Sequence, residues 1–283
     1  MADLIQLMYI TNQPRIAKIA EAAGTDRIFV DMEFLGKKDR QGGMDTVQCH
    51  HTFEDVANIR KTISEAKLQV RCNPIHDACE ESRGSDLEIG QILQQGADII
   101  MLPYFKTPEE VERFLSLVGG RARTNLLVET PEAVAAIHEI LSIPGIDEVH
   151  VGLNDLSLGY GKKFMFELMS DGTVENLCGK FQDAGIPYGI GGIASLGRGM
   201  LPAEYVIKEH YRLGSTAAIL SRSFCNANQI ADINIIRRIF RNGVQEIREF
   251  EKECAQADRE DLLENKQQMD RIIASIVNRQ GKV

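Results

Sequence analysis

Short apolar runs alternate with segments of helical period along most of the chain. An apolar run that ends in polar, Gly or Pro residues is typical of a buried parallel strand, whereas apolar residues at i, i+3, i+4 and i+7 indicate an amphipathic helix. This pattern predicts strands at residues 4–10, 27–33, 68–73, 98–104, 125–129, 148–153, 187–193 and 217–222. Each predicted strand is followed by a helical segment, so the pattern predicts eight βα units.

The starts of two predicted helices are marked by the same tripeptide, Thr-Pro-Glu, at residues 107–109 and 130–132. Thr caps the free amides, Pro suits the first helical position, and Glu complements the helix dipole. Regular βα repetition also occurs in open, doubly wound sheets. Eight units in 283 residues favour closure into a (β/α)8 TIM barrel, an α/β fold that typically needs about 250 residues.

After residue 228 the chain changes to a long segment without proline, rich in charge and in helix-forming residues. It is longer than one eighth helix requires, and its apolar positions recur at helical spacing. We therefore predict a barrel domain at residues 1–228 and a helical extension at residues 229–283. The apolar face of this extension either covers its own barrel or joins subunits into a homo-oligomer, and we expect the second arrangement.

Composition narrows the class of protein. Hydrophobic residues make up 43% and charged residues 26%, which is ordinary for a globular protein. A net charge of -9 disfavours nucleic-acid binding, which relies on Lys and Arg. No segment has the length and apolarity of a membrane span, the first residues lack the features of a signal peptide, and the scattered cysteines indicate free thiols. We expect a cytoplasmic protein with a small-molecule partner and no membrane contact.

Candidate chemistry lies where the predicted strands end, because a barrel of this kind builds its active site at the carboxyl ends of its strands. The polar residues at these ends are Asp31, Glu33, Arg71, Asn73, Glu129, Asn154 and Asp155. Glu129 and Asp155 end neighbouring strands with no His or Cys nearby, an arrangement that suits a hard cation such as Mg2+ or Mn2+. Alternatively, Glu129 caps the next helix and Asp155 is a turn residue.

Three local motifs resemble the HpcH/HpaI aldolase and citrate lyase family of the phosphoenolpyruvate/pyruvate barrel superfamily. They are GADIIMLPYFKTPEEVE at 96–112, LLVETPEAVAAIHEIL at 126–141 and PGIDEVHVGLNDLSLGYG at 144–161, with a weaker match in VRCNP at 70–74. The resemblance implies that Glu129 and Asp155 bind the metal and that Arg71 stabilises an enolate. It also implies that the turn at Leu153, Asn154 and Asp155 holds the substrate carboxylate.

The segment after the second predicted strand departs from the family. Aldolases of the family typically have Asp-Gly-Glu-His there, whereas this chain has Asp31-Met32-Glu33-Phe34. The acid/base histidine is therefore missing, and His50 or His51 from the following loop is a candidate replacement. Asp31 or Glu33 would order a water at the metal or help to position the base. A basic cluster, which binds a substrate anion or is simply a solvated surface, comprises Lys37, Lys38 and Arg40.

These observations predict a metal-dependent aldolase, an aldehyde-lyase that acts on a 2-oxo acid and an aldehyde through a pyruvate enolate. Cleaving the bond beta to a ketone requires a Lewis acid and a fixed positive group at the developing oxyanion. Three alternatives stay open: a citryl- or malyl-CoA-type lyase, a non-catalytic barrel that acts as a binding or assembly protein, and a metal-free aldolase that uses Lys106 as a Schiff base.

Overall fold

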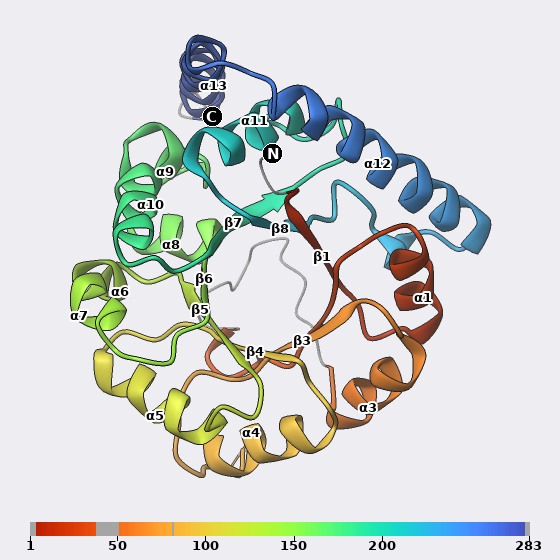
Figure 1. The fold of residues 1–283 in the computed structure, drawn as a ribbon, viewed down its shortest axis with the longest axis vertical. Coiled ribbons are helices and arrows are strands. Elements are labelled where there is room, and N and C mark those ends of the chain that lie inside the picture. The colour runs from red at the N-terminus through yellow and green to blue at the C-terminus, as the bar shows by residue number, and fades with distance from the viewer. Residues whose placement is uncertain (1–3, 38–50, 81, 281–283) are drawn as a thin grey trace.

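The computed structural model describes residues 4–37, 51–80 and 82–280. Within this part of the chain, eight parallel strands close into one barrel, in chain order, with β8 paired to β1 (Figure 1). The prediction of a (β/α)8 TIM barrel is confirmed. The strands are β1 (Gln6–Ile10), β2 (Arg27–Asp31), β3 (Lys67–Arg71), β4 (Ile99–Leu102), β5 (Arg123–Val128), β6 (Glu148–Val151), β7 (Tyr188–Ile193) and β8 (Ala217–Leu220).

Helices form the outer ring and cover the strands (Figure 1). They are α1 (Pro14–Ala22), α3 (Phe53–Thr62), α4 (Ser85–Gln94), α5 (Pro108–Val118), α6 (Pro131–Ala135), α7 (Ile137–Leu141), α8 (Leu153–Gly159), α9 (Glu167–Ser170), α10 (Thr173–Asp183), α11 (Ala203–Leu213), the 3-10 turn Ala227–Gln229, α12 (Ile233–Cys254) and α13 (Arg259–Gln280). Thr107 and Thr130 accept hydrogen bonds from the first-turn amides of α5 and α6, so both predicted caps are confirmed.

The barrel interior is apolar in the middle and polar at its amino-terminal end. Phe29, Met101 and Leu127 form the apolar layer. Below it, Arg27 forms a bidentate ion pair with Glu148, and the Glu148 carboxylate also accepts a hydrogen bond from Asn125 at 2.8 Å. This network closes the floor of the barrel, on the side opposite the strand ends where an active site is expected.

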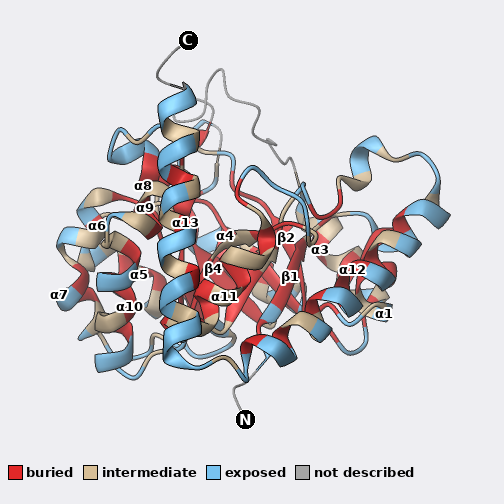
Figure 2. Cartoon of the chain, turned by 90° about the horizontal axis from the view of Figure 1, so that it is seen from above, coloured by how far each residue is buried: buried red, intermediate tan, exposed pale blue. Residues whose placement is uncertain are grey.

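The last two helices take different places on the barrel. α12 packs against α1 and α11, and its Glu251 accepts a hydrogen bond of 2.6 Å from the amide of Ile5 at the start of β1. α13 runs along α11 and α9 and buries Met269 and Ile273 (Figure 2). The division of the chain at residue 228 and the assembly of subunits through these helices stay predictions.

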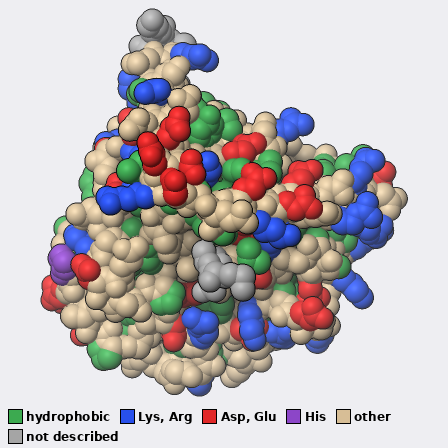
Figure 3. Space-filling model, turned by 45° about the horizontal axis from the view of Figure 1, so that its top comes forward, with side chains coloured by type: hydrophobic (Ala, Val, Ile, Leu, Met, Phe, Trp, Pro, Cys, Tyr) green, Lys and Arg blue, Asp and Glu red, His purple; other side chains and the backbone are tan. Residues whose placement is uncertain are grey.

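The surface carries both signs of charge. On the face in Figure 3, acidic and basic side chains are interspersed, so the net negative charge does not gather there in one field. Among the described residues, no helix has the length and apolarity needed to cross a membrane. Cysteines 72, 79, 178, 225 and 254 are free thiols, as predicted, whereas Cys49 lies outside the described residues.

Candidate active site

A cavity of about 550 Å³ opens at the carboxyl ends of the strands. This size lies within the usual range for small-molecule sites, about 300–1,000 Å³. The cavity brings together most of the candidates from the sequence, namely Asp31, His51, Arg71, Glu129, Leu153, Asn154 and Asp155. Glu33 lies directly beside it, and His50 lies outside the described residues. The cavity therefore contains residues from the carboxyl ends of β2, β3, β5 and β6.

Glu129 follows β5 directly and is 4% exposed. It does not cap α6, because Thr130 does so by accepting a 3.1 Å hydrogen bond from the amide of Ala133. The carboxylate instead lies against Gly152 at the end of β6, where a Cβ would stand 2.7 Å from Oε2. Glycine at 152 thus leaves the space that Glu129 occupies.

Tyr104 helps to orient Glu129 through its backbone. It is the one described non-glycine residue with positive φ, 49°, and its amide donates a 3.0 Å hydrogen bond to Oε1 of Glu129. A bulky residue rarely adopts this conformation, and holding it costs about 1–3 kcal/mol. The strained backbone at Tyr104 therefore helps to hold Glu129, a candidate metal ligand, in place.

Two substitutions test this coupling. Tyr104→Gly is expected to keep both the turn and the activity, with the free energy of unfolding changed by less than about 1 kcal/mol. Tyr104→Val is expected to destabilise by about 1–3 kcal/mol and to weaken activity, because a β-branched residue resists positive φ. Urea unfolding and initial rates measure both effects. Equal activity in the two variants would show that the turn does not position Glu129.

Asp155 lies in the first turn of α8 and is 7% exposed. Asn154 donates a 3.2 Å hydrogen bond to its Oδ1. Glu129 and Asp155 supply hard oxygen donors at the same cavity, and Mg2+ commonly takes only one or two carboxylates while water and substrate oxygens complete its shell. In the described part of the chain, no group of three or more His, Cys, Asp or Glu side chains has metal-site geometry. The two carboxylates thus fit a metal site that water and substrate oxygens complete, and not a site made of protein ligands alone.

Arg71 ends β3 and points into the cavity. Asp31 holds it with two hydrogen bonds, Nε to Oδ1 at 2.8 Å and Nη2 to Oδ2 at 2.7 Å, and Glu33 lies 3.4 Å from Nη1. Burial opposes the charge on Arg71, but the neighbouring carboxylates, Asp31 first, raise its pKa well above the usual value. The guanidinium is therefore a permanent, rigidly oriented positive group.

Lys37 belongs to the same cluster, which the sequence did not establish. Its Nζ lies 2.8 Å from Asp31 Oδ2 and 3.5 Å from Glu33 Oε2, and the residue is 5% exposed. Burial by itself raises the pKa of Asp31, but the charges of Arg71 and Lys37 outweigh it and hold that pKa well below its usual range. Asp31 is thus a carboxylate that orients Arg71 and has no proton to give at neutral pH. Lys38 and Arg40 lie outside the described residues.

His51 lies over the end of β2. Its Nδ1 accepts a 3.0 Å hydrogen bond from the amide of Asp31, so the neutral ring carries its proton on Nε2. Burial lowers the pKa of the ring, which favours this neutral form. His51 therefore presents an N–H donor, and it would have to give up the Asp31 amide before its Nδ1 could accept a proton.

Asn73 fixes the segment in which Phe34 replaces the family histidine. Its Oδ1 accepts hydrogen bonds of 2.9 Å from the amides of Phe34 and Leu35, and its Nδ2 donates to Glu88 at 2.8 Å. Phe34 is 40% exposed and lines a neighbouring cavity at the β2 and β3 ends. Phe34 is absent from the described lining of the active-site cavity.

Lys106, in the loop after β4, bears on the Schiff-base alternative left open by the sequence, and His150 of β6 is a further titratable group at the cavity. Lys106 pairs with Glu132 at 2.9 Å, and this hydrogen bond raises its pKa, whereas a Schiff base needs a neutral amine. Lys106 is also absent from the described lining of the cavity. His150 does line it, but burial lowers its pKa to about 4 and its Nε2 is 3.0 Å from the carbonyl of Gly191. His150 is therefore a neutral ring in the lining of the cavity.

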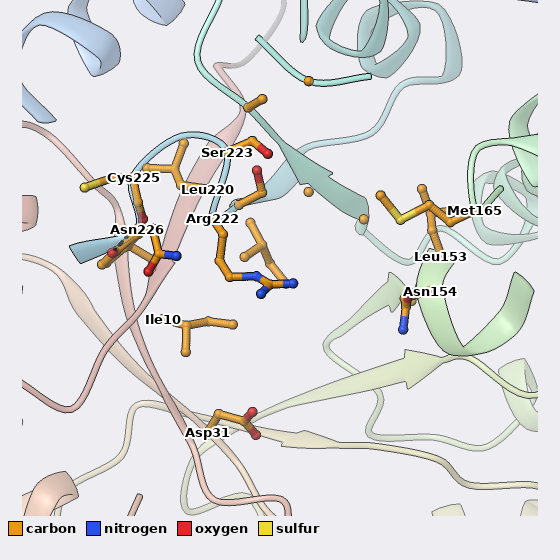
Figure 4. A pocket seen from close by; sticks show the side chains of 18 of the residues that line it. Ile10, Asp31, Leu153, Asn154, Met165, Leu220, Arg222, Ser223, Cys225 and Asn226 are labelled. Carbon is orange, nitrogen blue, oxygen red and sulfur yellow. Dashed lines mark hydrogen bonds between the residues drawn. The ribbon is translucent and has the colours of Figure 1, made fainter. Parts of the chain in front are cut away.

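Arg222, in the loop after β8, lines the cavity and was missed as a site residue. The predicted strand at 217–222 ended on this arginine, so the rule that selected Arg71 and Glu129 would also have selected Arg222. In Figure 4 its side chain extends from this loop toward the middle of the cavity, with Asp31 and Asn154 on other sides. The cavity therefore has basic groups on two walls.

The structure is thus a (β/α)8 barrel with carboxylates and an arginine at the ends of β3, β5 and β6, the face on which barrels of this fold build their active sites. The family model for HpcH/HpaI aldolase/citrate lyase matches residues 5–166. The chain belongs to this family, which confirms the resemblance of its motifs.

Individual relatives are distant. A hydroxypyruvate/pyruvate aldolase of Sagittula stellata is 28% identical over 104 residues, which cover 26% of this chain and 41% of the relative. The match thus spans less than half the length of that enzyme. A family protein of Burkholderia cenocepacia has a TM-score of 0.61 at 17% identity and covers 87% of this chain and 95% of its own. Citrate synthase SbnG has a TM-score of 0.58 at 17% identity, with coverage of 78% and 86%. These structures share the fold.

Proposed function

We propose that this protein is a divalent-metal-dependent aldolase that cleaves or forms a hydroxy-2-oxo acid through a pyruvate enolate. The observation that carries the proposal is the meeting of Arg71, Glu129 and Asp155 in one cavity at the carboxyl ends of β3, β5 and β6. Membership of the HpcH/HpaI family supports lyase chemistry, and the partial match to a hydroxypyruvate/pyruvate aldolase supports a 2-oxo acid substrate.

Glu129 and Asp155 would hold Mg2+ or Mn2+, because both are buried carboxylates at the same cavity and together leave room for further oxygen ligands. A divalent ion bound there would supply a Lewis acid for the 2-oxo acid. The Tyr104 amide keeps one oxygen of Glu129 in place.

The protein's own groups have three roles in this proposal. Arg71 donates to the ketone oxygen and stabilises the negative charge that develops on it, since Asp31 already fixes the plane of its guanidinium. The backbone amides in the first turn of α8, at Leu153, Asn154 and Asp155, bind the substrate carboxylate. His51 holds its proton at Nε2 and donates it as a hydrogen bond to the hydroxyl oxygen of the substrate.

The proposed cleavage balances without an external oxidant or reductant. The bond between C3 and C4 of the 4-hydroxy-2-oxo acid breaks, and its electron pair forms the enolate. The C4 hydroxyl gives its proton to water and becomes the aldehyde carbonyl, and C3 of the enolate takes up a proton from water to give pyruvate. Condensation is the reverse sequence, in which C3 of the enolate attacks the aldehyde carbon.

Exchange of the pyruvate methyl protons in D2O tests the enolate and the metal together. NMR is expected to show exchange with Mg2+ or Mn2+ present, and EDTA is expected to stop it. Glu129→Gln is expected to need at least about tenfold more metal for half-maximal exchange, because a ligand charge is lost. Glu132→Gln, an exposed substitution three residues away, is the control and should behave like the parent.

Two results would contradict the proposal. Exchange that is indifferent to EDTA would remove the metal, and an absence of exchange under all metals would remove the pyruvate enolate. If the protein cleaves a citryl or malyl thioester and not a free hydroxy-oxo acid, the site is that of a citryl- or malyl-CoA-type lyase.

A further inference from the structure

The turn that follows β2 determines how the guanidinium of Arg71 is held. Asp31, at the end of β2, accepts two hydrogen bonds from it, and Glu33 Oε2 lies 3.4 Å from its Nη1. Lys37, a few residues further on, places its Nζ 2.8 Å from Asp31 Oδ2. The backbone of Arg71 is fixed separately, because its carbonyl accepts a 3.0 Å hydrogen bond from the amide of Met32. The direction of the guanidinium therefore depends on where this turn places the three side chains.

Asn73, just after β3, anchors the backbone of this turn. Its Oδ1 accepts 2.9 Å hydrogen bonds from the amides of both Phe34 and Leu35. The amide of Lys37 donates to the carbonyl of Phe34 at 3.3 Å, so the backbone of Lys37 follows that of Phe34. Asn73 thus fixes the backbone segment that carries Lys37 to the cluster around Arg71.

Glu88, in α4, determines the direction of the Asn73 side chain. Its Oε1 accepts hydrogen bonds from the Asn73 amide at 3.0 Å and from Nδ2 at 2.8 Å. Because Nδ2 is the donor of that side chain and Oδ1 its acceptor, the bond from Nδ2 to Glu88 directs Oδ1 to the amides after β2. Glu88 is 6% exposed, burial raises its pKa, and its Oε2 has no hydrogen-bond partner among the described residues. Oε1 is therefore the atom through which Glu88 acts.

We propose that Glu88 is a positioning residue for the enolate-forming step, and that it holds the guanidinium of Arg71 through Asn73 and the turn after β2. This inference rests on the proposed function and extends it to two residues outside the described lining of the active-site cavity. An oxyanion is stabilised by donors within hydrogen-bond distance, so a small displacement of Arg71 lowers the rate. Glu129 follows β5 and Asp155 lies in α8, whereas these contacts join α4, β3 and β2, so metal affinity should not depend on Glu88.

Three substitutions test this role by methyl exchange of pyruvate at saturating metal. Glu88→Leu removes the acceptor and is expected to slow the exchange about 10- to 100-fold, the effect of a small misplacement of a catalytic group. Asn73→Ala removes the acceptor of the two turn amides and should give a similar loss. Glu88→Gln keeps an oxygen that accepts both bonds from Asn73 and should restore most of the rate. The metal concentration for half-maximal exchange should stay parental in all three.

A double substitution decides whether Glu88 acts through Arg71. If Glu88 affects the rate by orienting the guanidinium, its removal matters little once the guanidinium is gone. Arg71→Lys combined with Glu88→Leu should therefore be slower than Arg71→Lys alone by less than about threefold. Losses that multiply would mean that Glu88 affects the rate by another route, and they would overturn the role.

A buried carboxylate elsewhere in the barrel provides the control for lost stability. Glu209 of α11 is fully buried and accepts hydrogen bonds of 3.0 and 2.8 Å from Arg212. Glu209→Leu should lower the free energy of unfolding but keep the parental rate of methyl exchange per folded molecule. A loss of rate in Glu209→Leu as large as in Glu88→Leu would reduce the effect of Glu88 to general destabilisation and overturn its positioning role.

Amide hydrogen exchange of the peptide at residues 33–37, measured by mass spectrometry, reports the turn without any reaction. This peptide should lose protection in Glu88→Leu and keep it in Glu88→Gln and Glu209→Leu, because the first variant alone frees the Asn73 side chain. Unchanged protection in Glu88→Leu, or a Glu88→Gln enzyme as slow as Glu88→Leu, would overturn the inference and leave the enolate mechanism intact. A parent that does not exchange pyruvate protons would overturn the enolate and, with it, this role.

Discussion

Replacing Arg71 with lysine is expected to slow methyl exchange of pyruvate by about 100- to 1,000-fold, the usual cost of losing one strong oxyanion donor. Lysine keeps the positive charge but cannot make the paired hydrogen bonds that Asp31 accepts at 2.8 and 2.7 Å. Its ammonium would be drawn toward Asp31 and Glu33 and away from the ketone oxygen. The rate measured by NMR at saturating metal gives the effect directly.

The same substitution should leave the barrel folded, because Lys37 and the new lysine together still balance Asp31 and Glu33. Arg60→Lys is a matched control. Arg60 pairs with Asp98 at 2.8 Å on the outer side of the barrel, outside the described lining of the cavity. Its exchange rate should equal that of the parent. An Arg71→Lys enzyme with parental exchange would show that charge alone suffices and that the oriented guanidinium has no special role.

The sequence predicted the part of this site that depends on strand ends. Parallel strands in a closed barrel all finish on one face, so the polar residues that directly follow their apolar runs gather at that face. Arg71, Glu129 and Asp155 follow from this geometry without any knowledge of loops. Their meeting in the structure therefore rests on local pattern and one rule of topology.

The sequence could not place residues whose position depends on how loops fold back. Lys37 looked like part of a surface cluster, yet the turn after β2 carries it to Asp31 and buries it. The sequence placed Asn73 at a strand end. It did not predict that Asn73 accepts hydrogen bonds from the amides of Phe34 and Leu35, which follow the neighbouring strand β2. Such contacts depend on how a turn folds or on residues far apart in the chain, and periodicity carries no information about either.

The helical extension shows a similar limit. Its apolar spacing predicted helices after residue 228, and the structure has α12 and α13 there, but spacing alone does not say which surface a helix covers. Here Arg248 and Glu251 of α12 bond to the backbone of Ile5, which ties this helix to the start of the first strand. α13 lies beyond it, against α11 and α9.

The largest loss of stability is expected from Glu148→Ala, at the amino-terminal end of the barrel. The side chains of Arg27 and Glu148 are 3% and 7% exposed, and removing one partner of such a buried pair typically costs about 3–5 kcal/mol. Arg27 would keep its 3.0 Å hydrogen bond to Gln69 but lose its counter-charge. Urea unfolding should show this cost as a lower midpoint with an unchanged slope.

A double substitution separates the pair's own contribution from the penalty of an uncompensated charge. Arg27→Met with Glu148→Leu removes both charges, so it should be less destabilised than the sum of the single variants by about 1–3 kcal/mol. Because the pair lies below the apolar layer of Phe29, Met101 and Leu127, the folded fraction of each variant should exchange pyruvate protons at the parental rate. Additive losses in the free energy of unfolding would mean that the two residues contribute independently. A slower exchange rate per folded molecule would mean that the Arg27–Glu148 pair helps to position Arg71 or Glu129.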